Sequence, residues 1–272
     1  MSKPPVVWTI AGFDPSCGAG ITADLKTISS LGCYGAACIT ALTVQNTMGV
    51  RRVEPVSTLT VRETLHALLE DIPPAAIKIG MLATSGIASL VADFLEALPQ
   101  PRCPIVLDPI LRSSSGAELL DAAGVQVLLA CLLPLSTVVT PNRTEAAILT
   151  GLSLEDAEGA ATALRQLGTA AAVVTGGDPA GSANQQFSED VLAYSAGGME
   201  FIETLSAPRI HSSATHGTGC AFSTAIACGL ARGQSVPAAV TAAKAFVRRA
   251  IERAPGLGHG KGPMGLDQAS KD

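Results

Sequence analysis

The chain has 272 residues, of which 47% are hydrophobic and 15% charged, so it contains enough apolar material to bury one large core. Aromatic residues make up only 3%, a balance that favours an α/β architecture in which small side chains pack between helices and a buried parallel sheet. The formal net charge is -5 and the basic residues are scattered, which argues against a nucleic-acid partner.

The cysteines and the start of the chain both favour a cytoplasmic protein. The seven cysteines are odd in number and show no C-x-x-C pairing, unlike those of secreted disulfide frameworks or zinc sites. The segment from Met1 to Trp8 lacks the apolar core and cleavage pattern of a signal peptide. The uncharged runs 27–50 and 122–142 contain glycines, polar side chains or a proline, so we interpret them as buried elements and not as membrane spans.

Six short apolar runs rich in β-branched residues are predicted to be strands. Stretches with helical periodicity lie between most of them, for example at 61–72, where the apolar residues share one face of a helix. This alternation predicts right-handed βαβ crossovers and a parallel sheet. The predicted strands are residues 6–11, 38–44, 76–79, 105–107, 137–139 and 171–175.

The last third of the chain departs from this alternation. Residues 189–205 contain Gly197-Gly198 between two β-like runs and predict an antiparallel hairpin at one sheet edge. Two long helices are expected at 217–233 and 236–253. Because no repeat or linker divides the chain, we expect one domain over 1–254, followed by a flexible tail over 255–272.

The first glycine-rich segment, Ala11 to Gly20, follows the first predicted strand directly. It contains neither G-x-G-x-x-G nor G-x-x-x-x-G-K-[ST], so it is neither a dinucleotide fingerprint nor a Walker A loop. Gly176-Gly177, which follows the sixth predicted strand, could bring backbone close to phosphates or could simply form a turn.

Two acidic residues follow neighbouring predicted strands. Asp108 comes directly after the run 105–107, and Glu145 lies in the segment Thr140-Pro-Asn-Arg-Thr-Glu after the run 137–139. Carboxylates at adjacent strand ends suit Mg²⁺ and its water ligands. Taken alone, Asn142 and Glu145 also fit an ordinary capping box at the start of a helix.

A second glycine-rich segment, Thr215-His-Gly-Thr-Gly-Cys220, opens the first of the two long C-terminal helices. The first turn of a helix leaves backbone N–H groups without intrahelical partners, and glycines let these donors approach an anion closely. Cys220 lies in this turn, where the helix dipole favours a thiolate. A glycine-rich turn with a buried structural cysteine is the alternative. The four histidines show neither metal-ligand spacing nor a nucleophile triad.

Together these segments resemble the hydroxymethylpyrimidine and phosphomethylpyrimidine kinases, a branch of the ribokinase-like superfamily. The resemblance covers nearly the whole chain and implies a ribokinase-like three-layer α/β/α fold with a mainly parallel sheet and an antiparallel edge hairpin. The resembling segments are Thr9 to Gly20, Ala23 to Thr27, Ile39 to Thr47, Lys78 to Leu82, Leu107 to Pro109, Thr140 to Asn142 with Glu145, and Thr215 to Cys220.

The resemblance implies an enzyme that uses ATP and Mg²⁺ to phosphorylate 4-amino-5-hydroxymethyl-2-methylpyrimidine, and then its monophosphate, in thiamine biosynthesis. Cys220 would act as the base, with the amides of Gly217, Thr218 and Gly219 beside the transferred group. The implied pyrimidine-binding residues are Gly12, Asp24, Gln45, Met81 and Ile110. The implied nucleotide-binding residues are Asn142, Thr175 and Gly177, and the implied metal ligands are Asp108 and Glu145.

This chain departs from the family pattern at three positions. Cys17 stands where the family usually has glycine. Arg112-Ser-Ser114 and Thr175 stand where lysines are common. The loss of two cations near phosphates puts the second phosphorylation in question, although Arg112 could replace one of them.

Several alternatives stay open from the sequence. The nearest is a pyridoxal kinase, because a related branch shares the Cys-bearing loop. A cysteine hydrolase or acyl transferase would use Cys220 with His216 as its base. A ligand-binding regulator would have kept the fold and lost catalysis. Dimers are common in the superfamily, so the resemblance allows a homodimer.

Overall fold

The strand β1 (Val6–Phe13) lies in the interior of a sheet to which nine strands contribute within the described residues, 3–113, 116–177 and 186–269. In this computed structural model, successive side chains of β1 enter opposite apolar layers. Val7 packs into one core cluster, while Trp8 and Ile10 pack into the other, and all three are fully buried. A strand that is apolar on both faces must be covered on both faces, which produces a three-layer architecture.

The strand order in the sheet is β3-β2-β1-β4-β5-β6-β7-β8-β9. The pairs from β2 to β7 are parallel, whereas β3 pairs antiparallel with β2 at one edge, and β8 and β9 continue antiparallel from β7 at the other. The remaining strands are β2 (Tyr34–Asn46), β3 (Gly49–Pro55), β4 (Ala76–Ile79), β5 (Ile105–Leu107), β6 (Val138–Val139), β7 (Ala171–Val174), β8 (Phe187–Ala196) and β9 (Met199–Pro208).

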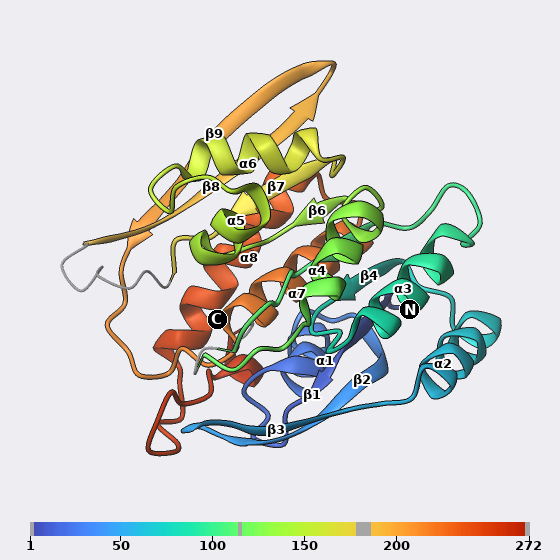
Figure 1. The fold of residues 1–272 in the computed structure, drawn as a ribbon. Coiled ribbons are helices and arrows are strands. Elements are labelled where there is room, and N and C mark those ends of the chain that lie inside the picture. The colour runs from blue at the N-terminus through green and yellow to red at the C-terminus, as the bar shows by residue number, and fades with distance from the viewer. Residues whose placement is uncertain (1–2, 114–115, 178–185, 270–272) are drawn as a thin grey trace.

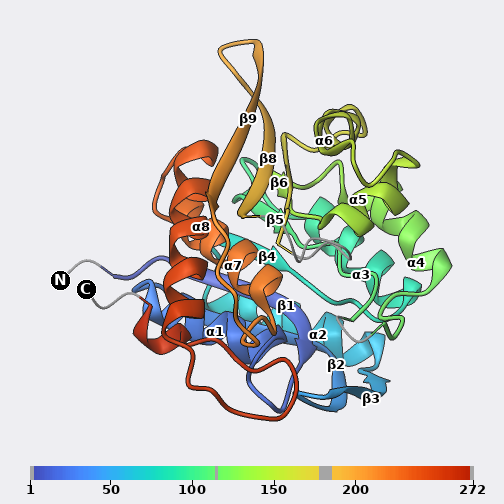
Figure 2. The same cartoon turned by 90° about the vertical axis from the view of Figure 1, so that its left-hand side faces the viewer.

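Helices cover both faces of the sheet (Figures 1 and 2). One layer holds α1 (Gly20–Ser30), α7 (Thr218–Ala231) and α8 (Val236–Glu252). The opposite layer holds α2 (Thr58–Asp71), α3 (Ser85–Glu96), α4 (Ala122–Val127) with a π-helical turn at Leu128–Leu132, α5 (Arg143–Thr150) and α6 (Ala157–Gln166). Among the helices of the described residues, none has the length and apolarity that a membrane crossing requires.

The predicted α/β fold and the antiparallel edge hairpin are confirmed. The runs 76–79 and 105–107 coincide with β4 and β5, and the hairpin β8–β9 turns at Gly197-Gly198. The uncharged run 122–142 forms a helix and a separate strand. Strand β3 was not predicted because its half-exposed sequence, with Arg51 and Arg52, lacks the apolar pattern of a buried strand. Ser114, the last residue of the segment Arg112-Ser-Ser114 that stands where a lysine was expected, lies outside the described residues.

The prediction of a flexible tail was wrong for residues 255–269. The segment returns across α8 and α1, where Met264, Leu266 and Ala269 are buried in the same core cluster as α7. Backbone hydrogen bonds anchor it, including one from the Gly265 amide to the Ala250 carbonyl at 2.8 Å. A 3-10 turn at Leu266–Gln268 ends the segment. The few apolar side chains among its glycines are enough to dock it.

A buried ion pair lies between the sheet and the α1–α7 layer. The Lys78 ammonium on β4 is 2.9 Å from the Asp24 carboxylate on α1, and both side chains are completely buried. The same carboxylate accepts hydrogen bonds from Thr9 on β1 at 2.5 Å and from Thr224 on α7 at 2.8 Å. Asp24 is not among the residues that line the cavity described below, so the substrate-binding role that the resemblance implies for it stays a prediction.

Replacing Asp24 with alanine should lower the free energy of unfolding by about 3–5 kcal/mol, because Lys78 would remain buried without its counter-charge. The paired replacement Asp24→Leu with Lys78→Met should recover most of this loss, since it removes both charges. Urea unfolding monitored by circular dichroism measures both values. An Asp24→Ala protein of wild-type stability with weakened substrate binding would support the substrate-binding role.

Candidate active site

The carboxyl ends of the parallel strands open into a cavity of about 680 Å³. Gly12 near the end of β1, Met81 after β4, Asp108 after β5 and Thr175 after β7 all line it. Loops at this edge of a parallel sheet converge, which is why ligands of open α/β folds bind there. The volume lies within the range of roughly 300–1,000 Å³ typical of small-molecule sites.

A second cavity of about 420 Å³ adjoins the first and is lined by residues of β8, β9, α7 and α8. The two cavities meet at the start of α7. The residues that line both are Thr175, Gly177, Thr215, Thr218, Gly219 and Lys261. A group at this junction would be within reach of ligands in either cavity.

No side chain caps the start of α7, and its N-cap residue is a glycine. This residue, Gly217, has a φ of 75°, which is a left-handed conformation. A Cβ atom on Gly217 would lie 2.0 Å from the Gly18 carbonyl oxygen. The two glycine-rich loops therefore touch, and only glycine allows this approach. The amides of the first turn remain as donors for an anion.

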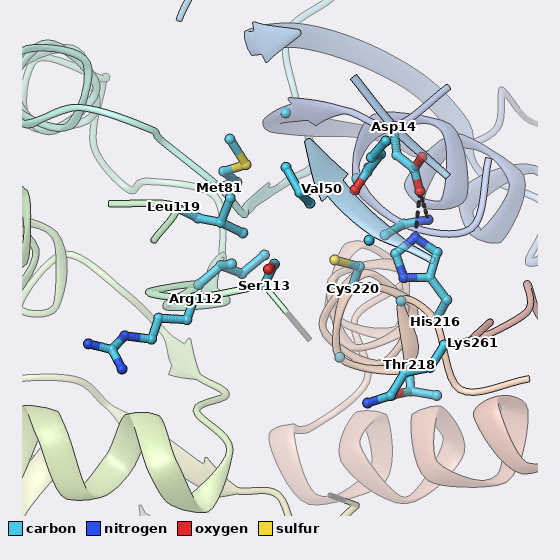
Figure 3. Close-up of a pocket in the computed structure, with 18 of the residues that line it drawn as sticks. Asp14, Val50, Met81, Arg112, Ser113, Leu119, His216, Thr218, Cys220 and Lys261 are labelled. Carbon is cyan, nitrogen blue, oxygen red and sulfur yellow. Dashed lines mark hydrogen bonds and ion pairs between the residues drawn. The ribbon is translucent and has the colours of Figure 1, made fainter. Parts of the chain in front are cut away.

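A second contact joins the same two loops. His216 Nε2 donates to Asp14 Oδ2 at 2.7 Å, and Asp14 also accepts hydrogen bonds from the Ser16 and Ala19 amides (Figure 3). Burial alone would raise the pKa of Asp14, but the bonds with His216 and Ser16 together lower it. This bond occupies one of the two ring nitrogens of His216. Because a carboxylate also orients the imidazole in Ser–His–Asp triads, the bond by itself does not decide the hydrolase alternative, in which His216 would activate Cys220.

Cys220 lines the larger cavity, but the pKa of its thiol is raised and not lowered. Burial raises the pKa of its thiol to about 12, and the nearby Lys78 charge offsets this effect only in part. Burial therefore acts on this pKa in the direction opposite to the helix dipole, which the sequence suggested would favour a thiolate. The thiol also donates a hydrogen bond to the Asp108 carboxylate. The effect of burial is large because the residue is only 7% exposed.

The two acids predicted to bind metal, Asp108 and Glu145, are both buried, and the pKa of each is raised. Burial raises the pKa of Asp108 to about 6. Burial, reinforced by the charge of Asp108, raises the pKa of Glu145 to about 8. Asp108 accepts a hydrogen bond from Ser223 at 3.3 Å. Glu145 completes a capping box with Asn142, so the local structural interpretation of this motif is confirmed.

These acids fit a divalent cation. Two desolvated carboxylates that repel one another would both gain from a positive ion between them. Within the described residues, no group of three or more His, Cys, Asp and Glu side chains could hold a metal by itself. Mg²⁺ requires no such cage, since it commonly binds through one or two carboxylates, water and substrate phosphates.

The cavity brings together all but one of the predicted site residues, the exception being the buried Asp24. Those that line it are Gly12, Gln45, Met81, Asp108, Ile110, Asn142, Glu145, Thr175, Gly177, Gly217, Thr218, Gly219 and Cys220. The sequence did not indicate Lys261, which arrives from the supposed tail, or Thr47 and Met48, which arrive from the unpredicted β2–β3 hairpin. The pairing of Asp14 with His216, 202 positions apart, leaves no local signal.

Comparisons with known proteins agree with this geometry. A family model described as phosphomethylpyrimidine kinase matches residues 14–265. The hydroxymethylpyrimidine/phosphomethylpyrimidine kinase of Haemophilus influenzae is 41% identical over 97% of each chain. The enzyme of the same description from Synechococcus elongatus is 40% identical over 96% of this chain and 97% of its own.

Solved structures resemble the fold closely. Pyridoxal kinase from Staphylococcus aureus, in complex with AMP-PCP and pyridoxal, matches with a TM-score of 0.83 at 33% identity, over 97% of this chain and 94% of its own. Phosphomethylpyrimidine kinase from Clostridium difficile matches with a TM-score of 0.75 at 34% identity, over 91% of this chain and 99% of its own.

The elevated pKa of Glu145 predicts a pH-dependent stability. A carboxyl whose folded pKa is raised from 4.5 to about 8 favours folding most below pH 4.5, and this contribution is lost as the pH rises through 8. Glu145→Gln, which keeps the hydrogen-bonding shape, should therefore gain stability relative to wild type across this interval. Urea unfolding at a series of pH values without metal measures the difference. A difference that does not change with pH would contradict the assignment.

The contact between the glycine-rich loops predicts unequal costs for two alanine substitutions. Gly217→Ala and Gly233→Ala both place a side chain at positive φ, which costs about 1–2 kcal/mol. Only Gly217→Ala also forces a Cβ against the Gly18 carbonyl, whereas Gly233 has no atom within 4 Å of that position. We expect a clearly larger loss of thermal stability for Gly217→Ala. Equal losses would show that the loops can separate without cost.

Proposed function

Because this chain belongs to the phosphomethylpyrimidine kinase family, we propose that it transfers the γ-phosphoryl group of ATP to 4-amino-5-hydroxymethyl-2-methylpyrimidine, and then to the resulting monophosphate. The observation that carries this proposal is the junction of the two cavities at the amide-rich start of α7. A transferred phosphoryl group needs such a place, where donors stabilise its charge between two ligands.

In this proposal the acceptor occupies the larger cavity. Gly12, Met81 and Ile110 form an apolar wall, and the Gln45 amide supplies both a donor and an acceptor for the amino-pyrimidine edge. The nucleotide extends into the second cavity past Thr175 and Gly177, with Asn142 nearby. Asp24 is left out, because its carboxylate is already occupied by Lys78 and two threonines.

The reaction is an in-line displacement. The hydroxymethyl oxygen forms a bond to the γ-phosphorus while the bond from that phosphorus to the β,γ-bridging oxygen breaks, and ADP departs with the electron pair. The amides of Gly217, Thr218, Gly219 and Cys220 stabilise the charge on the moving group. Cys220 acts as the thiolate, having lost its proton to water before the acceptor binds, and takes up the hydroxyl proton late in the transfer. The buried Lys78 charge lowers the cost of forming this thiolate.

Asp108 and Glu145 would hold Mg²⁺, which, when bound, neutralises charge on the phosphates. Their repulsion in a desolvated site supports this assignment. Relatives also support the use of a nucleotide, since structures of the S. aureus pyridoxal kinase contain AMP-PCP and ADP. We further propose that the protein acts in the cytoplasm, where its seven free thiols stay reduced, and that it forms a homodimer, which light scattering would test.

A pyridoxal kinase is the second candidate. It is supported by the fold match to the S. aureus enzyme, whose structure contains pyridoxal. Both acceptors carry a hydroxymethyl group on a six-membered nitrogen heterocycle, so shape alone does not separate them. The curated relatives at 40–41% identity favour the pyrimidine.

Product analysis by mass spectrometry tests the proposal. Incubation with the hydroxymethylpyrimidine, ATP and Mg²⁺ should yield the mono- and diphosphate, and Cys220→Ala should lower kcat by about a hundredfold or more while leaving acceptor binding intact. Cys228→Ala, a buried cysteine on the same helix that does not line either cavity, is the matched control.

Parallel reactions with pyridoxal decide between the two candidates. Turnover of pyridoxal without turnover of either pyrimidine acceptor would overturn the substrate assignment. A Cys220→Ala enzyme as fast as wild type would remove Cys220 as the base and leave the rest of the proposal standing.

A further inference from the structure

Two of the residues around the cavities, Thr175 and Arg112, do not supply a cation at their junction. Thr175 is uncharged. The Arg112 side chain lines only the larger cavity, is 61% exposed and lies 3.9 Å from Glu118. Figure 3 shows Arg112 extending away from Cys220 and His216. The junction of the cavities nevertheless has to balance the charge of the phosphates.

Lys261 lies at this junction. Among the described residues it is the one Lys or Arg that lines both cavities. Figure 3 shows it on the same side of the cavity as Thr218 and His216. Arg209, Lys244 and Arg248 line only the second cavity.

The backbone around Lys261 is fixed on both sides. The Gly262 amide donates to the Ser213 carbonyl at 2.9 Å, and the His216 amide donates to the Gly262 carbonyl at 3.2 Å. On the other side, a Cβ on Gly260 would lie 2.1 Å from the Thr47 carbonyl oxygen. The segment 256–263 therefore joins the β2–β3 turn to the loop before α7, with Lys261 between the two anchors.

We propose that the Lys261 ammonium binds the γ-phosphoryl group at the junction and makes the monophosphate acceptable as a second acceptor, an inference that rests on the function proposed above. In the second reaction, the acceptor phosphate and the γ-phosphate meet at the same point, so their mutual repulsion is greatest there. A cation at the junction therefore stabilises the second reaction more than it stabilises the first, in which the acceptor is a neutral alcohol.

Steady-state kinetics with both acceptors test the inference. Lys261→Ala should lower kcat/KM for the alcohol about tenfold, as expected for the loss of one charged hydrogen bond, and for the monophosphate by clearly more. Lys261→Arg should recover much of both rates because it keeps the charge. Arg112→Ala, at the rim of the same cavity, is the matched control and should stay near wild type. A larger loss in Arg112→Ala, or equal losses for both acceptors in Lys261→Ala, would overturn the inference.

A binding measurement separates this inference from the proposed function. Calorimetry should show that Lys261→Ala weakens AMP-PCP, which carries a γ-phosphoryl group, more than ADP, which does not. An unchanged ratio of the two affinities would overturn the inference even in an active enzyme. If wild type phosphorylated neither pyrimidine, the proposed function would fail, and the affinity ratio would still decide the role of Lys261.

Discussion

The buried pairing of Lys78 with Asp24 is the interaction on which the rest of the site depends. Lys78 is completely buried, and although burial alone would lower its pKa, the negative groups around it raise that pKa, so it stays protonated. Its charge acts on Asp24 in α1, on Asp108 directly after β5 and on Cys220 in α7. Without this cation, the acids below the cavity would face one another in a desolvated environment that favours neither ionisation nor close packing.

The contacts of the ion pair also help to hold α7 in a fixed position. Asp24 binds Thr9 on β1 and Thr224 on α7, so one carboxylate ties a central strand and two helices together. Six residues before Thr224, α7 begins where the two glycine-rich loops touch. Amide donors stabilise a moving charge only if they are aimed in advance, because reorientation during the reaction would cost the energy that they supply. The buried contacts of α7 therefore determine how well the amides of its first turn are held in position to stabilise that charge.

Much of the fold and most of the site could be predicted because their signals are local. The run 105–107 is apolar throughout and the run 76–79 is apolar except for Lys78, and each is followed by residues that line the cavity. Local signals were insufficient where contacts between distant parts of the chain decide the structure. Asp24 has the residue type of a ligand-binding group, yet its partner Lys78 is 54 positions away. Residues 255–269 have the composition of a loose tail, yet Met264 and Leu266 dock them onto the core.

The pKa of the Cys220 thiol is another property that local sequence signals do not determine. The place of Cys220 in the first turn of a helix is visible in the sequence, and so is the dipole that would favour a thiolate. The cost of burial is not visible, because it depends on how completely the neighbouring elements exclude water. A thiol with a raised pKa is protonated in the resting site, and nearby positive charge raises the fraction present as the thiolate, which is the form that can accept a proton. The chemistry of the thiol is therefore set by the charges around it, Lys78 beneath and Asp108 beside, more than by its position on the helix.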